Sequence, residues 1–270
     1  MSYDNFPEEY NEGMSAETAK VALVTGASKG IGKCIAIELG RAGFDVAVNY
    51  NSDLAGAQDT VAQIEALGRK AVPMQGNVGD VESTRRLFDQ LDTHFGDIHV
   101  LVANAAVQTW KALLDLTVEE WDKVLNTNLR GTFVCTQEAA KRMVAKGHGG
   151  SIITLGSGCN KLAFPRLVDY TAAKGGIEMF TKVAAVELGK YQIRVNCVAP
   201  GATEVERTKG ETGDYAGTWA PATPLRRIGL PIDIARAVLF FAGDQSDFVT
   251  GQTLFVDGGV GAKPQWPYEF

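Results

Sequence analysis

Residues 21–32 read VALVTGASKGIG, a short apolar segment that runs directly into a glycine-rich turn. Successive apolar residues predict a strand covered on both faces, and IGKCIAIELGRAG from Ile31 predicts a helix after the turn. Gly26, Gly30 and Gly32 allow a tight turn and a close approach to a phosphate, while the helix N-terminus offers unpaired N–H groups to an anion. The stretch therefore predicts a dinucleotide-binding turn; the alternative is an ordinary entry into a helix.

The same alternation of short apolar segments and longer amphipathic ones continues along the chain. Strands are expected at VALVT 21–25, VAVNY 46–50, AVPM 71–74, VLVA 100–103, SIITL 151–155, IRVNCVA 193–199 and TLFVD 253–257. Helices are expected to begin near Ile31, Leu54, Ser83, Val118, Tyr170 and Pro231. The pattern predicts an α/β fold: a Rossmann-type doubly wound parallel sheet of about seven strands, flanked by helices, in a single domain.

Three segments lie outside this rhythm. Residues 1–19 are acidic and polar, which predicts a mobile N-terminal arm before a nucleotide-binding domain at 20–259. Residues 202–224 are rich in Gly, Thr and Pro, and a loop of that length predicts a lid. Residues 260–270 carry Trp266, Tyr268 and Phe270, which favour docking on a neighbouring subunit; a disordered tail is the alternative.

Composition narrows the partners. The 270 residues carry a net charge of −6 with scattered lysines and arginines, so neither nucleic acid nor an anionic membrane is expected as a partner. No apolar run approaches the ~20 residues of a membrane span, and the N-terminus lacks a signal-peptide pattern, which predicts a cytoplasmic protein. The four cysteines include no CxxC pair and the three histidines have no ligand-like spacing, so no metal site is expected. A small-molecule substrate is the remaining expectation.

The end of the second predicted strand bears on which nucleotide binds. Many NAD-binding domains place an acid there against the ribose hydroxyls, but here the chain reads Tyr50, Asn51, Ser52 before Asp53. No carboxylate repels a 2′-phosphate, and Lys29 can supply a cation, so NADP(H) is favoured over NAD(H). The alternative is that Lys29 is only solvated and Asp53 turns inward to bind NAD.

Further polar residues sit at matching places in the pattern. Tyr170 and Lys174 are four apart on a predicted helix, so their polar ends can share one space. Ser157 follows the strand SIITL, and Asn128 lies in TNLRG within a long predicted helix. With TGASKGIG, Asn104 in VLVANAA and CVAPG at 197–201, the chain from 20 to 259 resembles the short-chain dehydrogenase/reductase family, short single-domain type.

The resemblance implies a catalytic set of Asn128, Ser157, Tyr170 and Lys174. Tyr170 would act as general acid or base at the substrate oxygen during hydride transfer, with Lys174 lowering its pKa from ~10. Ser157 would donate a hydrogen bond to that oxygen, and Asn128 would hold a water in a relay to Lys174. The alternative for Asn128 is a polar residue that kinks a helix.

The resemblance also implies the cofactor contacts, with three departures from the family pattern: Ala106 replaces a glycine, Asn77 replaces an acid, and ATEVERT follows Pro200 and Gly201. Expected cofactor-binding residues are Gly26, Ser28, Lys29, Gly30, Ile31, Gly32, Tyr50, Asn51, Ser52, Asn77, Val78, Asn104, Ala105, Tyr170, Lys174, Pro200, Gly201 and Thr203.

The substrate is expected to be a sugar, a polyol or a small polar ketone that is interconverted with its alcohol. This expectation rests on the mixed polarity of the plausible pocket residues Cys159, Asn160, Phe164, Asp169, Thr203, Glu204 and Trp219. A 3-oxoacyl-thioester reductase is the enzymatic alternative, and an NADP-sensing regulatory protein is the non-enzymatic one. A sugar-nucleotide epimerase is disfavoured by length. The family resemblance further implies a homotetramer.

Overall fold

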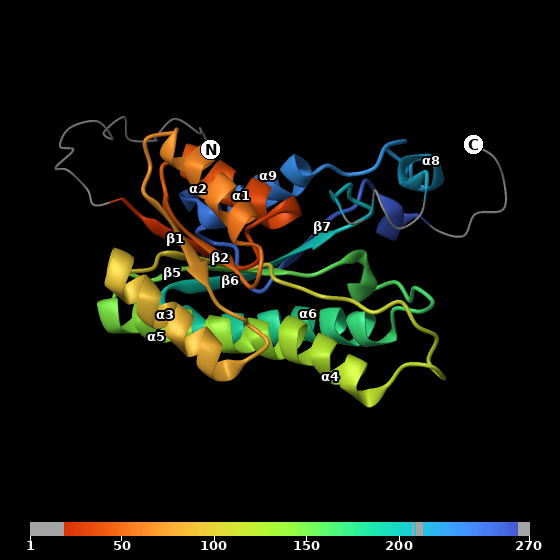
Figure 1. Ribbon diagram of the computed structural model, residues 1–270, viewed down its shortest axis with the longest axis horizontal. Coiled ribbons are helices and arrows are strands. Elements are labelled where there is room, and N and C mark those ends of the chain that lie inside the picture. Colours follow the sequence, from red (N-terminus) through yellow and green to blue (C-terminus); the bar gives the residue numbers. More distant parts are fainter. Residues whose placement is uncertain (1–18, 207, 209–212, 264–270) are drawn as a thin grey trace, which may run out of the picture.

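Seven parallel strands form one sheet across the described part of the chain, which in this computed structural model comprises residues 19–206, 208 and 213–263 (Figure 1). The strands are β1 (Val21–Val24), β2 (Asp45–Tyr50), β3 (Ala71–Gln75), β4 (Val100–Ala103), β5 (Gly150–Leu155), β6 (Ile193–Pro200) and β7 (Thr253–Val256). Their order is β3-β2-β1-β4-β5-β6-β7. The order reverses between β1 and β4, and a crevice opens there at the carboxyl ends of the strands, where ligands of this fold class bind.

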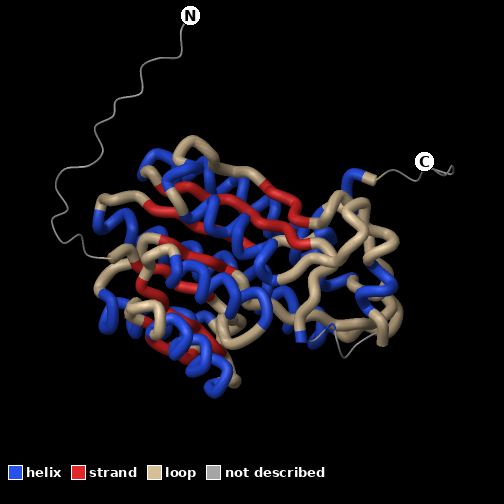
Figure 2. The backbone as a smooth tube through the Cα atoms, turned by 90° about the horizontal axis from the view of Figure 1, so that it is seen from above, coloured by secondary structure: helices blue, strands red, loops and turns tan. Residues whose placement is uncertain are grey.

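Helices cover both faces of the sheet (Figures 1 and 2). On one face lie α1 (Gly30–Arg41), α2 (Leu54–Glu65) and α9 (Pro231–Ala242); on the other lie α3 (Val81–Phe95), α5 (Gly131–Lys146) and α6 (Val168–Leu188), with α4 (Val118–Leu125) packed on α6. A short helix, α8 (Tyr215–Trp219), stands beyond the carboxyl end of the sheet. None of the described helices is long and apolar enough to cross a membrane.

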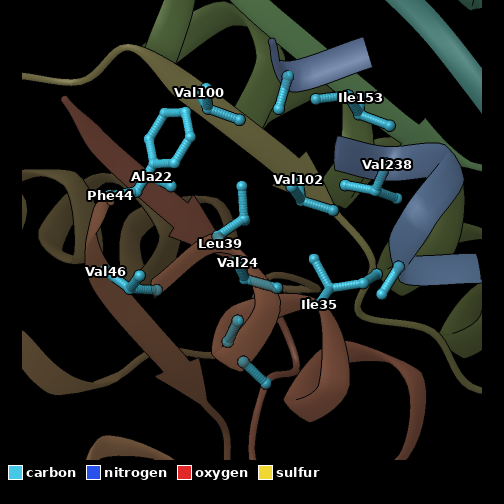
Figure 3. Packing of buried hydrophobic residues seen from close by; sticks show 14 of the residues in the cluster. Ala22, Val24, Ile35, Leu39, Phe44, Val46, Val100, Val102, Ile153 and Val238 are labelled. Carbon is cyan, nitrogen blue, oxygen red and sulfur yellow. The ribbon is translucent and has the colours of Figure 1, made fainter. Parts of the chain in front are cut away.

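The alternation of side chains along each strand divides the apolar core into two layers. Ala22 and Val24 of β1 pack with Ile35 and Leu39 of α1 and with residues of α9, as Figure 3 shows. Leu23, between them, points to the opposite layer, which α3, α5 and α6 complete. Because both faces are covered, the strands must be apolar at every position, which explains the near-continuous apolar runs in the sequence.

All seven predicted strands and the Rossmann-type order of the sheet are confirmed, with ends that differ by at most a residue or two. The helix expected from Val118 differs from the expectation of one continuous α-helix, because a π-helical turn, Asn126–Arg130, separates α4 from α5. Asn128 is fully buried within that turn. A π-turn inserts an extra residue into a helical ladder, so periodicity on either side continues and the sequence shows no interruption.

The predicted N-terminal arm at 1–19 lies, except for its last residue, outside the described residues, as do the aromatic residues of the C-terminal extension. Within the segment 202–224 the described residues include α8 and a bridge between Thr203 and Gly229.

A buried asparagine ties the glycine-rich turn to the sheet. Asn49 is 1% exposed; its side chain accepts the N–H of Gly26 at 3.2 Å and donates to the carbonyls of Met74 at 3.2 Å and Gly76 at 3.1 Å. One amide thereby fixes the ends of β1, β2 and β3 relative to one another. A polar side chain at a strand end in the core is explained by these three backbone partners.

Replacing Asn49 by alanine is therefore expected to lower the free energy of unfolding by about 2–3 kcal/mol, because three buried backbone groups lose their partner. Chemical denaturation checks this. Asn51→Ala, at an exposed position two residues on, is the matched control and should change stability by less than about 0.5 kcal/mol. Equal stability of the two variants would contradict the anchoring role.

Candidate active site

A single cleft of about 1060 Å³ runs along the carboxyl ends of the strands and holds most of the predicted site residues. It begins at the glycine-rich turn, passes the ends of β4 and β5, and reaches α8. Of the four expected catalytic residues, Ser157, Tyr170 and Lys174 line it, and Asn128 does not. A cleft of this size at the switch point is where a dinucleotide and a small substrate could lie together.

The glycine-rich turn is shaped by close backbone contacts. A Cβ on Gly32 would lie 2.3 Å from the carbonyl oxygen of Gly26 and 2.5 Å from Nδ2 of Asn104, so no side chain fits. Gly26 and Gly30 have φ of +63° and +58°, a region that favours glycine. Asn104 is held here by donating to the carbonyls of Thr25 at 2.8 Å and Gly26 at 3.2 Å.

This geometry fits a dinucleotide. The N-cap of α1, Lys29, is extended and accepts no hydrogen bond with its side chain, so the first turn of the helix directs N–H groups into the cleft. Unpaired N–H groups and the positive end of the helix dipole favour a pyrophosphate. Ser28, Gly30, Ile31 and Gly32 line the same part of the cleft.

The ribose end differs from the sequence expectation at one residue. Asn51 and Ser52 line the cleft, whereas Tyr50 is 8% exposed, belongs to the apolar core and does not line it. Tyr50 points into the core because the alternation along β2 places it on the same face as Val46 and Val48, under α1 and α2. Asp53 lines the cleft but already caps α2, with Oδ1 accepting the N–H of Gly56 at 3.0 Å. To bind a ribose, Asp53 would have to share or give up that cap.

The adenine side is bordered by Asn77, Val78, Asn104 and Ala105, all of which line the cleft. Oδ1 of Asn77 accepts the N–H of Gly79 at 3.0 Å, so its amide nitrogen remains for a ligand. Ala106, where the family pattern has glycine, is absent from the positive-φ residues, which explains why an alanine is tolerated.

Ser157 is positioned by its own turn. It precedes the short helix η2 (Gly158–Asn160), where its Oγ accepts the N–H of Cys159 at 3.2 Å and its N–H donates to Oδ1 of Asn160 at 3.0 Å. An Oγ that accepts from the backbone still carries its proton, so Ser157 can donate to a substrate oxygen.

Lys174 is buried beside Tyr170. Its Nζ donates to the carbonyl of Leu155 at 2.6 Å and lies 5.4 Å from the centroid of the Tyr170 ring, one helical turn away on α6. Burial lowers the pKa of Lys174 to about 8. The ammonium is therefore mostly charged at pH 7 and favours the phenolate of Tyr170 there, but this support weakens as the pH passes 8.

Asn128 does not line the cleft, and its side chain bonds to the backbone of Val107. Its Oδ1 accepts the N–H of Val107 and its Nδ2 donates to the carbonyl of Val107, both at 2.8 Å. Thr132 donates to the backbone carbonyl of Asn128 at 2.6 Å. The side chain thus ties the π-turn to the segment after β4. The relay to Lys174 that the resemblance implies remains a prediction.

The far wall follows β6. Pro200, Gly201 and Thr203 line the cleft, and a Cβ on Gly201 would lie 2.6 Å from Cα of Asp257, so the chain passes there without room for a side chain. Thr203 is 6% exposed, and its hydroxyl donates a hydrogen bond to the carbonyl of Gly201 at 3.1 Å. It is therefore engaged with the backbone.

The substrate end contains more aromatic residues than expected and lacks three of the expected polar ones. Cys159, Phe164, Thr203 and Trp219 line the cleft as predicted, whereas Asn160, Asp169 and Glu204 do not. Trp110 and Tyr215 also line it and were missed. Trp110 lies in a loop and Tyr215 in the five-residue helix α8, which is too short to show periodicity, so only their being aromatic in nonperiodic stretches could have singled them out.

At the amino ends of β1, β4 and β5, opposite the cleft, side chains far apart in sequence meet. Nε2 of His148 lies 2.9 Å from Oδ1 of Asp97, and the His148 ring stacks on His99 with centroids 4.5 Å apart and planes 8° from parallel. Nδ1 of His99 accepts the N–H of Val21 at 3.1 Å. Sequence spacing had not brought these histidines together. Because the rings are parallel, no single ion can lie in both ring planes, and the group braces the entries to β1, β4 and β5.

The chain resembles known proteins over nearly its whole length. A family model described as enoyl-(acyl carrier protein) reductase matches residues 26–261. The L-rhamnose 1-dehydrogenase (NAD(P)(+)) of Sphingomonas sp. (strain SKA58) is 38% identical over 243 residues, covering 89% of this chain and 96% of that one. The 3-oxoacyl-[acyl-carrier-protein] reductase FabG of Staphylococcus aureus (strain Mu50) is 38% identical over 241 residues, covering 89% of this chain and 98% of that one.

Solved structures agree. A gluconate 5-dehydrogenase from Burkholderia cenocepacia J2315, in complex with NADP and tartrate, superposes with a TM-score of 0.85 at 32% identity, covering 91% of this chain and 96% of that one. The sheet order, the glycine-rich turn and the full-length similarity lead to one conclusion: the chain belongs to the short-chain dehydrogenase/reductase family, and is an oxidoreductase of that family.

Proposed function

We propose that the protein interconverts a secondary alcohol and a ketone with NADP(H), using Tyr170 as the general acid and base. The observation that carries this proposal is that Ser157, Tyr170 and the buried Lys174 line one cleft with the glycine-rich turn. A nicotinamide dinucleotide held at that turn would supply or accept the hydride. A sensor of the nucleotide would need the turn but not the three polar residues beside it.

The proton chemistry follows from the surroundings of Tyr170. In reduction, the phenol gives its proton to the substrate oxygen while the Ser157 hydroxyl donates a hydrogen bond to the same atom. In oxidation, the phenolate takes the proton back. Lys174 stabilises that phenolate, because an ammonium close to the ring favours the charged form. Asn128 supports this arrangement indirectly, by fixing the π-turn that packs against α6.

NADP(H) is favoured because Lys29 lines the cleft at an exposed position, while Asp53, the carboxylate that follows β2, is engaged in capping α2. The exposed ammonium of Lys29 would attract a 2′-phosphate, and the carboxylate of Asp53, which already accepts a backbone N–H, is less available to bind the ribose hydroxyls of NAD(H). The gluconate 5-dehydrogenase of the same family, whose structure contains NADP, is consistent with this preference.

The substrate and the assembly are proposals of the same kind. A sugar or polyol is supported by the similarity to the L-rhamnose 1-dehydrogenase, and a 3-oxoacyl thioester by the similarity to FabG. The proposed location is the cytoplasm and the proposed assembly a homotetramer; the exposed apolar residues Met179, Val183 and Val186 along α6 support assembly, because they offer a surface for another subunit. The segment 202–224 remains a proposed lid.

Replacing Tyr170 by phenylalanine is expected to lower kcat by about 10²–10⁴-fold and leave the Kd of NADPH within about threefold, because only the proton donor is lost. Steady-state kinetics and fluorescence titration check the two parts. Tyr191→Phe, an exposed tyrosine at the end of α6, is the matched control and should keep full activity. Wild-type turnover by Tyr170→Phe would refute the assigned role.

Replacing Lys174 by methionine should abolish most activity and change the pH dependence of stability. The unfolded chain keeps the lysine proton up to the ordinary pKa of 10.5, whereas the folded chain releases it from about 8. Between these values the unfolded state binds more protons, so the wild type gains stability as the pH rises. From pH 7 to pH 10 the wild type should gain about 2–3 kcal/mol relative to Lys174→Met in the free protein.

Denaturation of the two proteins across this range is the measurement. If the difference in unfolding free energy between the two proteins stays constant with pH, the pKa of Lys174 is not lowered in the folded protein and the prediction is wrong.

Reversing the charge at Lys29 is expected to weaken NADPH binding about tenfold relative to NADH, because only NADPH carries the 2′-phosphate. Fluorescence titration with both nucleotides gives the ratio of the two Kd values. Lys33→Glu is the control: Lys33 lies one turn further along α1, pairs with Asp59 and does not line the cleft, so the ratio should change by no more than about twofold. An unchanged ratio in Lys29→Glu would remove Lys29 from the site.

A further inference from the structure

Aromatic side chains from three separate segments gather in the cleft beyond the catalytic residues. Trp110 follows β4, Phe164 lies between β5 and α6, and Tyr215 and Trp219 belong to α8; all four line the cleft. The ring centroids of Phe164 and Trp219 are 6.0 Å apart, and those of Tyr215 and Trp219 are 6.3 Å apart. These separations are typical of interacting aromatic rings, so the three rings form one continuous wall.

Backbone contacts also connect the segment that carries Trp110 to the segment that carries Phe164. The N–H of Lys111 donates to the carbonyl of Arg166 at 3.0 Å, and Lys111 pairs with Leu167 as a parallel bridge. This pairing fixes the loop of Trp110 beside the loop of Phe164. Trp110 is nevertheless 48% exposed, although its ring belongs to a concave site. A large apolar surface left open inside a cleft marks a place where an apolar ligand binds.

The aliphatic residues Leu162 and Leu167, which flank Phe164 in the sequence, also line the cleft, as does the polar residue Gln108. The polar residues that would favour a sugar, Asn160, Asp169 and Glu204, do not line the cleft. A sugar has several hydroxyl groups, each of which loses water on binding and needs a partner. A flat aromatic molecule needs far fewer polar partners, and its faces can contact the indole and phenyl rings.

We propose that the substrate carries a flat aromatic ring system joined, directly or through one methylene group, to the reacting carbonyl or alcohol carbon, and that Trp219 and Trp110 bind its faces. This inference rests on the proposed function for the reacting end of the molecule, where Tyr170 and Ser157 meet the oxygen. It concerns the other end, where the wall of Phe164, Tyr215 and Trp219 selects the class of substrate.

The test compares two ketones of the same two-ring framework, β-tetralone, which has an aromatic ring, and β-decalone, which has none. Calorimetric titration uses the protein saturated with NADP⁺, which cannot reduce either ketone, so binding is measured without turnover. We expect β-tetralone to bind about tenfold more tightly. The kcat/KM for reduction with NADPH should show a similar preference.

Trp219→Leu and, independently, Trp110→Leu should each reduce the preference for β-tetralone to less than about threefold, while β-decalone binding changes little. Because Trp110 lies outside α8, the same result in both variants could not come from a disturbance of α8 alone. Trp121→Leu is the matched control, because Trp121 lies on α4, does not line the cleft and should leave the preference unchanged.

The outcomes separate this inference from the proposed function. Equal binding of the two ketones, equal loss of both in Trp219→Leu, or a kcat/KM for oxidation of L-rhamnose above that for β-tetralol would overturn the aromatic substrate class. A clear binding preference for β-tetralone, with no turnover of any ketone or alcohol, would support the aromatic pocket and contradict the proposed oxidoreductase chemistry.

Discussion

The close approach of Gly32 to the carbonyl of Gly26 is the contact on which the site depends. With a hypothetical Cβ only 2.3 Å from that oxygen, the first turn of α1 can press against the end of β1 only if residue 32 has no side chain. Asn104, from the end of β4, and Asn49, from β2, then bind the backbone of the same turn. Three strand ends and a helix N-terminus are thereby fixed together, and the anion-binding N–H groups face the point where the strand order reverses.

A second constraint lies at Lys174, where position and charge work against each other. Its hydrogen bond to the carbonyl of Leu155 requires Nζ to be inside the protein, next to the ring of Tyr170. Burial makes the ammonium more effective on the phenolate, because fewer water molecules screen it, but burial also lowers the pKa of Lys174 to about 8. In the proposed mechanism the same residue would support proton transfer, while the burial of its charge destabilises the folded protein, as is common where catalytic groups are held in place.

The two ends of the cleft are built in different ways. The nucleotide end consists of backbone and short side chains at the ends of buried strands, so its shape follows from the sheet. The substrate end consists of residues between the strands and the long helices, such as Trp110 and Phe164 in loops and Trp219 in the short helix α8, which three separate segments bring together. Chemistry can therefore be shared across the family while the substrate differs from member to member, because loops can vary without moving the strands.

Sequence alone determined the strand positions and the parallel sheet, because local periodicity encodes them directly, whereas Ser157, Tyr170 and Lys174 were singled out as candidates by the resemblance of their motifs to those of the family. It could not show that Tyr50 turns into the core, since the face of β2 on which a residue lies depends on the helices that cover it. Nor could it show the π-turn at Asn128, whose amide finds its partner, Val107, 21 residues away. Only the tertiary structure decided which loop residues meet: the aromatic wall at the substrate end arises from contacts between distant segments, and neither periodicity nor spacing records such contacts.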